Sequence, residues 1–137
     1  MNGDMFVDTN VLVYAIGNDP VRTPCARKLL LAERSALHLS TQVLGEFIHV
    51  CVRKGFLGKQ DAVAVARDYM ATIKCHAITE RMVERAMELY VTHSFSYWDA
   101  LIVAAALEAN CAVLYTEDLQ PGQIIDGKLL VTNPLQP

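Results

Sequence analysis

Short apolar runs alternate along this chain with longer segments in which apolar residues recur at helical spacing. Residues 5–7 form the first apolar run, and a helical segment follows at 11–16. This alternation is typical of an α/β fold, in which crossover helices connect the parallel strands of a central sheet. We therefore predict a three-layer α/β/α sandwich with a largely parallel sheet, formed as a single domain by residues 1–137.

Capping residues indicate where several helices begin and end. Thr23 followed by Pro24 predicts an N-cap and a first helical residue. Ser40 or Thr41 is expected to cap the next helix, which should stop at Gly55. The expected strands are 5–7, 37–39, 75–78, 112–115 and one strand within 123–131, and the expected helices are 11–16, 24–34, 41–54, 60–73, 80–91 and 97–109.

The composition argues against a membrane or a secreted protein. Of the 137 residues, 53% are hydrophobic, which is enough to bury a core without disulfides. Apolar stretches such as 101–107 are far shorter than the roughly 20 residues that cross a bilayer. The N-terminal residues also lack the order of charges and apolar residues found in a signal peptide. We therefore expect a cytoplasmic protein.

The four cysteines do not form a recognisable metal-binding pattern. They are widely spaced, without a C-x-x-C pair and without a histidine at zinc-finger spacing. We expect buried, reduced thiols at Cys25, Cys51, Cys75 and Cys111.

Acidic residues follow two of the predicted strands. Asp8 comes directly after 5–7, and Asp118 comes shortly after 112–115. Ligands of parallel sheets bind at the carboxyl ends of strands, near the point where the strand order reverses. Asp8 can instead act only as a helix N-cap. Side chains alternate along an extended chain, so Thr116 and Asp118 should face one way and Glu117 the other. Glu117 stays an alternative to Asp118.

Two further acids lie on predicted helices. Glu46 interrupts an otherwise apolar segment, and Gly45 beside it costs about 1 kcal/mol in a helix while leaving space for close approach. Asp99 lies three residues after Ser96, where its carboxylate can bond back to the cap and favour the helix N-terminus. The apolar segment 100–106 follows, so the Asp99 carboxylate should lie at an edge or in a cleft.

Each acid taken alone can be a solvated surface residue, but their joint placement predicts a shared site. Carboxylates that converge repel one another unless a cation lies among them. Oxygen ligands of this type suit Mg²⁺ or Mn²⁺. The net charge of −3 argues mildly against a protein that neutralises phosphates with Lys and Arg, although bound metal ions supply local positive charge. The predicted ligands are Asp8, Glu46, Asp99 and Asp118.

Four segments around these acids resemble the PIN-domain family, and in particular the VapC-type toxins of bacterial toxin–antitoxin pairs. They lie in the expected order across nearly the whole chain, and the first and third are the most specific. The resembling segments are FVDTNVL at 6–12, VLGEF at 43–47, YWDALIVAAA at 97–106 and LYTEDL at 114–119, and VTNP at 131–134 resembles the tail of many such toxins.

The resemblance implies Mg²⁺- or Mn²⁺-dependent hydrolysis of single-stranded RNA. Residue by residue, it implies that Asp8, Glu46, Asp99 and Asp118 form the acidic cluster, with hydroxyl support from Thr9 and Thr116. It also implies a homodimer and a protein antitoxin that fills the active-site groove.

Three other functions remain open at this point. Residues 8–11 also resemble the start of a haloacid-dehalogenase phosphatase, but that class requires a second Asp where Asn10 stands and a lysine ahead of the later acids. A phosphoacceptor regulatory domain likewise requires a lysine partner. The third alternative is a PIN fold without catalytic activity that serves as a binding module.

Two basic stretches are candidates for RNA contact, although each can equally be a solvated helix face. They consist of Arg22, Arg27, Lys28 and Arg34, and of Arg53 and Lys54.

Overall fold

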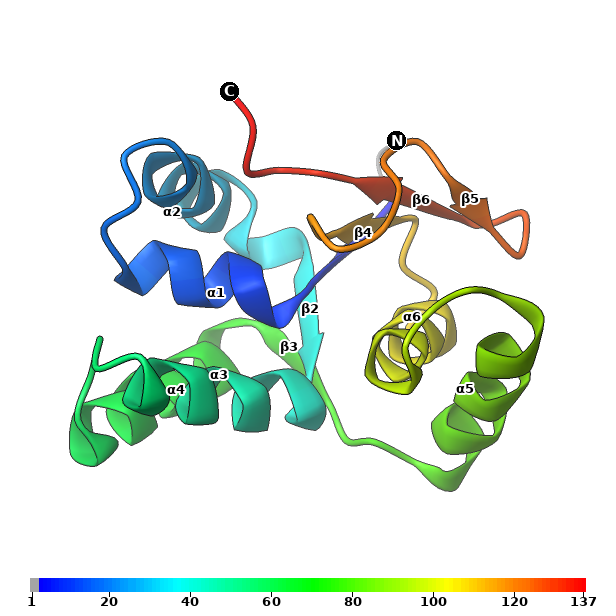
Figure 1. Ribbon diagram of the computed structural model, residues 1–137, viewed down its shortest axis with the longest axis horizontal. Coiled ribbons are helices and arrows are strands. Elements are labelled where there is room, and N and C mark those ends of the chain that lie inside the picture. The colour runs from blue at the N-terminus through cyan, green and yellow to red at the C-terminus, as the bar shows by residue number, and fades with distance from the viewer. Residues whose placement is uncertain (1–2) are drawn as a thin grey trace.

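The computed structural model describes residues 3–137 and has six strands in one sheet, in the order β3-β2-β1-β4-β6-β5 (Figure 1). The predicted α/β sandwich with a largely parallel sheet is confirmed. The strands are β1 (Met5–Val7), β2 (Leu37–Ser40), β3 (Lys74–His76), β4 (Val113–Tyr115), β5 (Ile124–Ile125) and β6 (Leu129–Thr132). The helices are α1 (Thr9–Ile16), α2 (Arg22–Ala32), the 3-10 turn η1 (Arg34–Ala36), α3 (Thr41–Arg53), α4 (Lys59–Thr72), α5 (Glu80–Thr92) and α6 (Tyr97–Glu108).

The sheet reverses its direction of growth between β1 and β4. From β1, parallel pairing extends to β2 and β3 on one side, and to β4 and β6 on the other. Among the strands of residues 3–137, β5 alone runs antiparallel, where it pairs with β6. The carboxyl ends of β1 and β4 therefore flank the switch point, which is where ligands bind in sheets of this kind.

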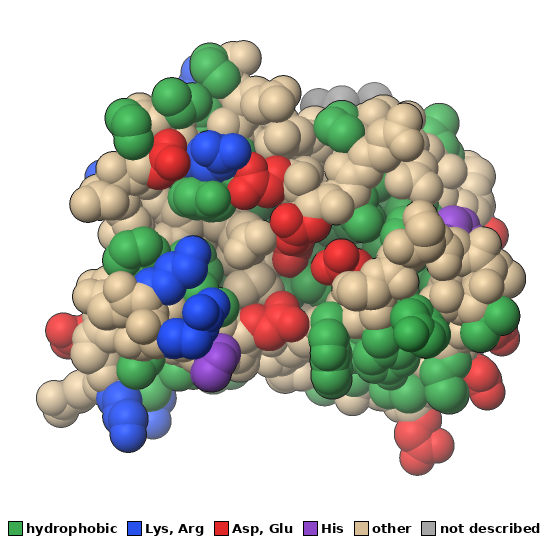
Figure 2. Space-filling model, in the orientation of Figure 1, with side chains coloured by type: hydrophobic (Ala, Val, Ile, Leu, Met, Phe, Trp, Pro, Cys, Tyr) green, Lys and Arg blue, Asp and Glu red, His purple; other side chains and the backbone are tan. Residues whose placement is uncertain are grey.

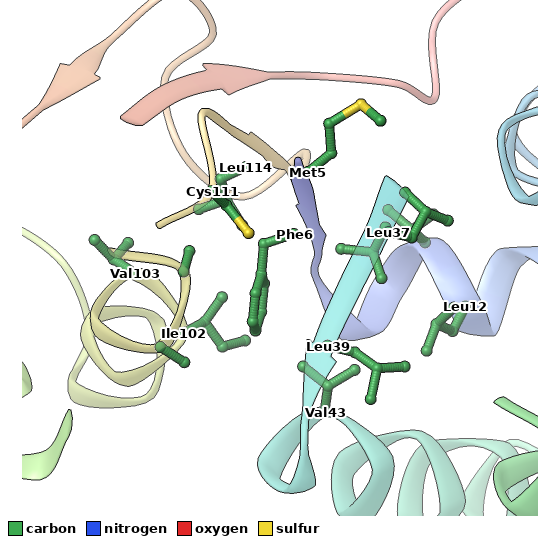
Figure 3. Close-up of a cluster of buried hydrophobic side chains, with 14 of the residues drawn as sticks. Met5, Phe6, Leu12, Leu37, Leu39, Val43, Ile102, Val103, Cys111 and Leu114 are labelled. Carbon is green, nitrogen blue, oxygen red and sulfur yellow. The ribbon is translucent and has the colours of Figure 1, made fainter. Parts of the chain in front are cut away.

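Helices cover both faces of the sheet, with α5 and α6 on one side and α1 to α4 on the other (Figure 1). The whole of β1 is buried, as expected for a central strand covered on both faces. Figure 3 shows Phe6 pointing from β1 toward Ile102 of α6, and both side chains belong to the same hydrophobic core. This packing holds the ends of β1 and α6 near each other.

The predicted cap of α2 is wrong. The helix begins at Arg22, and Thr23 lies within it. The carboxylate of Asp19 instead accepts hydrogen bonds from the backbone N–H groups of Val21 and Arg22, at 2.9 and 2.7 Å. The hydroxyl of Thr23 donates to the carbonyl of Tyr14 at 2.7 Å. Thr23 therefore connects α2 to α1, and the Asp19 carboxylate accepts hydrogen bonds from the backbone N–H groups at the start of α2.

Other local signals agree with the structure. Ser40 caps α3 by accepting from the N–H of Val43. Gly55 follows the end of this helix with a φ of 73°, a conformation that suits glycine.

The pattern predicts one strand within 123–131, whereas the structure has the two strands β5 and β6. Asp126 and Gly127 have φ values of 55° and 65° and form the tight turn between them.

The cysteine prediction is only half right. All four thiols are free, but Cys51 and Cys111 are buried whereas Cys25 and Cys75 are half-buried. Burial raises the pKa of the Cys111 thiol to about 12.

No helix within residues 3–137 has the length and apolar character needed to cross a membrane.

Candidate active site

Asp8 joins the end of β1 to the start of α1. Its backbone N–H donates to the carbonyl of Tyr115 at 3.0 Å, which ties the end of β1 to the end of β4. Its carboxylate caps α1 by accepting from the N–H of Thr9 at 2.6 Å. The second carboxylate oxygen accepts from the hydroxyl of Thr116 at 2.7 Å. Asp8 is therefore the helix cap and also a residue of the pocket between β1 and β4.

The carboxyl group of Asp8 is almost completely enclosed, with 5% of the residue exposed. Burial raises its pKa to about 7, and the neighbouring charge of Asp118 acts in the same direction. The hydrogen bond from Thr116 opposes this rise in pKa. A nearby cation would favour the ionised form and lower the pKa again.

Glu46 reaches the pocket from α3. One carboxylate oxygen accepts from the hydroxyl of Thr9 at 2.6 Å, and the other accepts from the amide of Gln42 at 3.3 Å. The same Gln42 amide donates to the carbonyl of Trp98 at 3.1 Å. Thr9 therefore connects α1 to α3, and Gln42 connects α3 to α6.

Asp99 lies in the first turn of α6, where Ser96 accepts a hydrogen bond from its backbone N–H at 3.1 Å. Partial burial raises the pKa of Asp99, and the charges of Asp118 and Glu46 raise it further, whereas the bond with Ser96 lowers it. The sequence pattern predicts a bond from the Asp99 carboxylate to the cap, whereas the hydrogen bond in the structure runs from the Asp99 backbone N–H to the Ser96 hydroxyl. Asp99 also lines the pocket.

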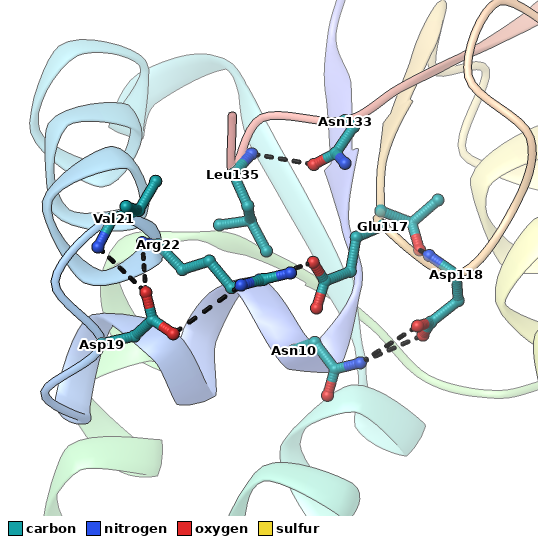
Figure 4. Close-up of polar contacts among 9 residues, drawn as sticks. Asn10, Asp19, Val21, Arg22, Glu117, Asp118, Asn133 and Leu135 are labelled. Atoms are coloured by element: carbon teal, nitrogen blue, oxygen red, sulfur yellow. Dashed lines mark hydrogen bonds and ion pairs between the residues drawn. The ribbon is translucent and has the colours of Figure 1, made fainter. Parts of the chain in front are cut away.

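Glu117 and Asp118 point in different directions after β4 (Figure 4). Asp118 accepts from the side-chain amide of Asn10 at 3.1 Å, and its N–H donates to the hydroxyl of Thr116 at 3.1 Å. Glu117 instead forms an ion pair with Arg22 at 2.8 Å. Asp118 lines the pocket and Glu117 does not.

The four predicted carboxylates lie together in one cleft of about 450 Å³. Figure 2 shows acidic side chains gathered around a hollow in the middle of this face. None of the four forms an ion pair with a Lys, Arg or His within residues 3–137. The lining residues are Asp8, Thr9, Asn10, Gly45, Glu46, His49, Val50, Asp99, Ile102 and Asp118.

This donor set fits a hard cation that keeps part of its water shell. Within residues 3–137, no three Asp, Glu, His or Cys side chains stand close enough to hold one ion together. Mg²⁺ is usually bound by one or two carboxylates, several waters and a phosphate of the substrate, so it does not require a closed cage of protein ligands.

The sequence did not predict the hydrogen bonds that Asn10 and Gln42 donate to Asp118 and Glu46. Gln42 precedes Glu46 by four residues, so helical spacing places both on one face of α3. Asn10 offers no comparable signal, because its contact with Asp118 spans 108 positions of the sequence.

A family model for the PIN domain matches residues 5–124. The chain belongs to the PIN-domain family. No curated protein matches the sequence. VapC-type members of this family are nucleases, so this PIN domain has the architecture of a nuclease. Membership of the PIN-domain family excludes a haloacid-dehalogenase phosphatase and a phosphoacceptor domain.

Solved structures of a VapC toxin and of toxin–antitoxin complexes share this fold. The Mycobacterium tuberculosis toxin VapC20, which cleaves the sarcin–ricin loop, has 25% identity and a TM-score of 0.72, over 84% of this chain and 90% of its own. A toxin–antitoxin complex from Klebsiella pneumoniae has 21% identity and a TM-score of 0.72, over 98% and 99% of the two chains. DNA-bound VapBC from Salmonella typhimurium has 17% identity and a TM-score of 0.73, over 96% and 98%.

Proposed function

We propose that this PIN domain is the toxin of a toxin–antitoxin pair and that it hydrolyses phosphodiester bonds of single-stranded RNA with Mg²⁺ or Mn²⁺. RNA as substrate implies that it acts in the cytoplasm. The likeness to VapC20 and to the Klebsiella and Salmonella complexes supports this proposal.

The observation that carries the proposal is the set of four carboxylates without a cationic side-chain partner at the switch point of the sheet. Acids placed this way attract a divalent cation from solution, and the cation then attracts the RNA phosphate. The proposed ligands are Asp8, Glu46, Asp99 and Asp118.

When bound, such a cation lowers the pKa of a water nucleophile and offsets the charge that develops on the phosphate. The protein side chains keep the carboxylates in position for it. Thr116 contacts both Asp8 and Asp118, which sets the spacing across the switch point. Thr9 holds Glu46 toward Asp8.

A cleavage assay on a generic single-stranded RNA tests this function. We expect cleavage with Mg²⁺ or Mn²⁺, none in chelator, and weak activity with Ca²⁺, which is larger and has a looser geometry. Asp8→Asn should abolish cleavage while the protein stays folded, because the change removes charge and almost no volume. Undiminished cleavage in chelator would overturn the metal requirement. A parent protein that binds RNA but never cuts it would support the alternative of a catalytically inactive binding module.

We also propose a protein antitoxin and a homodimer as partners, supported by the toxin–antitoxin complexes of the structural relatives. The product of a neighbouring reading frame should co-purify with this chain and inhibit RNA cleavage. The mass of the purified protein in solution tests the dimer. A protein that is monomeric at all concentrations would contradict it.

A further inference from the structure

Gly45 occupies an exposed position of α3, one residue before Glu46. Glycine weakens a helix relative to alanine because it has more conformational freedom to lose on folding. Apart from its chain neighbours and the backbone of its own helix, a Cβ atom at this position would meet no heavy atom of residues 3–137 within 4 Å, so packing does not require the absence of a side chain. Packing therefore does not explain the glycine, whereas a molecule that approaches the helix backbone from outside would.

Two cavities meet at Gly45. One is the acidic cleft, and the other is a groove of about 530 Å³ along α3 and α4. Both are lined by Gly45 and His49, so the cavities adjoin over one stretch of the α3 surface. A side chain at position 45 would project into the passage between them. The groove is lined by Gly45, Ile48, His49, Val52, Arg53, Lys59 and Val63.

The charge changes sign along this passage. Arg53 and Lys59 line the groove, and neither forms an ion pair with any residue of 3–137. Figure 2 shows Lys, Arg and His side chains next to the central acids, on the side of α3 and α4. The carboxylates require a cation to accept a phosphate, whereas Arg53 and Lys59 attract phosphates directly. A single strand of RNA carries one negative charge per nucleotide, so its phosphates can bind both a cation in the acidic cleft and the basic side chains of the groove.

We propose that single-stranded RNA crosses α3 at Gly45, so that nucleotides next to the cleaved bond lie in the groove with their phosphates near Arg53 and Lys59. The apolar floor formed by Ile48, Val52 and Val63 offers a surface for bases or riboses. Gly45 is then a positioning residue that lets the strand approach the helix backbone. This inference rests on the proposed RNA-cleaving function.

The first test adds a methyl group with Gly45→Ala. Alanine favours the helix, so this variant should melt roughly 3 °C above the parent. The KM for RNA should rise about tenfold, as expected when one carbon atom obstructs a binding surface, with a much smaller change in kcat. A variant that is more stable and binds RNA less well cannot be explained by misfolding.

Gly58→Ala is the matched control. Gly58 is the N-cap of α4, is exposed, and also has no heavy atom within 4 Å of a Cβ, but it lines neither cavity. Its KM should equal that of the parent. Gly45→Leu should raise KM more than Gly45→Ala, because the obstruction is larger.

The second test measures RNA binding against salt concentration in Ca²⁺, so that cleavage stays slow. Lys59→Gln should reduce the slope of log K against log salt by about 0.7, the value for one phosphate contact on a single strand. Lys128→Gln is the control, because Lys128 is exposed near the β5–β6 turn, away from α3 and α4 (Figure 1). Its slope should match that of the parent.

The two proposals fail in different ways. If the parent protein never cleaves RNA, the proposed function is wrong. The binding measurements in Ca²⁺ still test whether RNA crosses α3 at Gly45. If the parent cleaves RNA while Gly45→Ala and Lys59→Gln bind it as the parent does, the strand path alone is wrong. If both variants instead lose only the protein from the neighbouring reading frame, the groove belongs to a protein partner and the inference is overturned.

Discussion

Replacing Asp118 with asparagine should stabilise the metal-free protein, because it removes a negative charge near the buried Asp8 with little change in shape. The hydroxyl of Thr116 contacts both a carboxylate oxygen of Asp8 at 2.7 Å and the backbone nitrogen of Asp118 at 3.1 Å. The bond from Asn10 can persist, since an asparagine oxygen also accepts from its amide. The main effect is therefore the loss of repulsion between two carboxylates.

The size of the effect follows from this shared contact. Two like charges on the order of 6 Å apart repel by roughly 3 kcal/mol at an effective dielectric of about 20. Asp118 is exposed, so water screens part of this repulsion. We expect Asp118→Asn to raise the free energy of unfolding by about 1 kcal/mol, which shifts the melting temperature of a domain this size by about 3 to 4 °C.

Thermal melts followed by circular dichroism near pH 8, where Asp8 is largely ionised, measure this difference in chelator and in Mg²⁺. Mg²⁺ should reduce the difference in melting temperature between Asp118→Asn and the parent, because the parent keeps the full set of ligands and gains more binding energy from the ion. Glu117→Gln is the control at the adjacent position. It loses the ion pair with Arg22 and should melt at or below the parent. If Asp118→Asn melts no higher than the parent in chelator, the charge of Asp118 does not repel those of Asp8 and Asp99 as the structure implies.

The remaining predictions concern the neighbours of Asp118. Thr116→Val leaves a buried carboxylate oxygen of Asp8 without its hydrogen-bond donor. Urea unfolding should therefore show that the free energy of unfolding falls by about 1 to 3 kcal/mol. An unchanged value would show that this bond does not stabilise the protein. Asp99→Asn should gain less than Asp118→Asn in chelator melts, because it also removes a negative charge from the first turn of α6, an interaction worth roughly 0.3 to 1 kcal/mol. An equal gain would show that the Asp99 carboxylate does not stabilise the start of this helix. Burial raises the pKa of Asp8 to about 7, above its ordinary value of about 4. The folded state therefore keeps a proton that the unfolded state releases, and this contribution to stability falls as pH rises from about 4 to about 7. We compare the free energies of unfolding of Asp8→Asn and of the parent in chelator. The value for Asp8→Asn minus the value for the parent should rise between about pH 4 and about pH 7 and level off above this window. A difference that does not change with pH would refute the raised pKa of Asp8.

Local patterns in the sequence were sufficient to predict the layers of the fold. The meeting of the four acids was predicted from the position of ligands at the ends of parallel strands and from the resemblance to the PIN-domain family. The apolar run before Asp8 forms a buried strand because a central parallel strand is covered on both faces. Glu117 and Asp118 face different ways, as the alternation of an extended chain predicts, although both lie in bends after β4 rather than in a strand. The buried strand and the facing of these two acids were both predicted from residues that are adjacent in the sequence.

The partners of these residues were decided by the tertiary structure. Glu117 pairs with Arg22, 95 positions away, and the bond from Asn10 to Asp118 spans 108 positions. On β2, ring nitrogens of the buried His38 lie 2.7 Å from the Asp4 carboxylate and from the His76 ring, because the sheet order places the residue before β1 on one side and β3 on the other.

Gly45 shows the same division between sequence and structure. Its cost to the helix is apparent from the residue type alone, but the cleft and the groove that meet there exist only after α3 packs beside α1 and α4. Periodicity encodes which face of an element is buried, whereas the order of the strands and the packing of the helices determine which distant side chains meet.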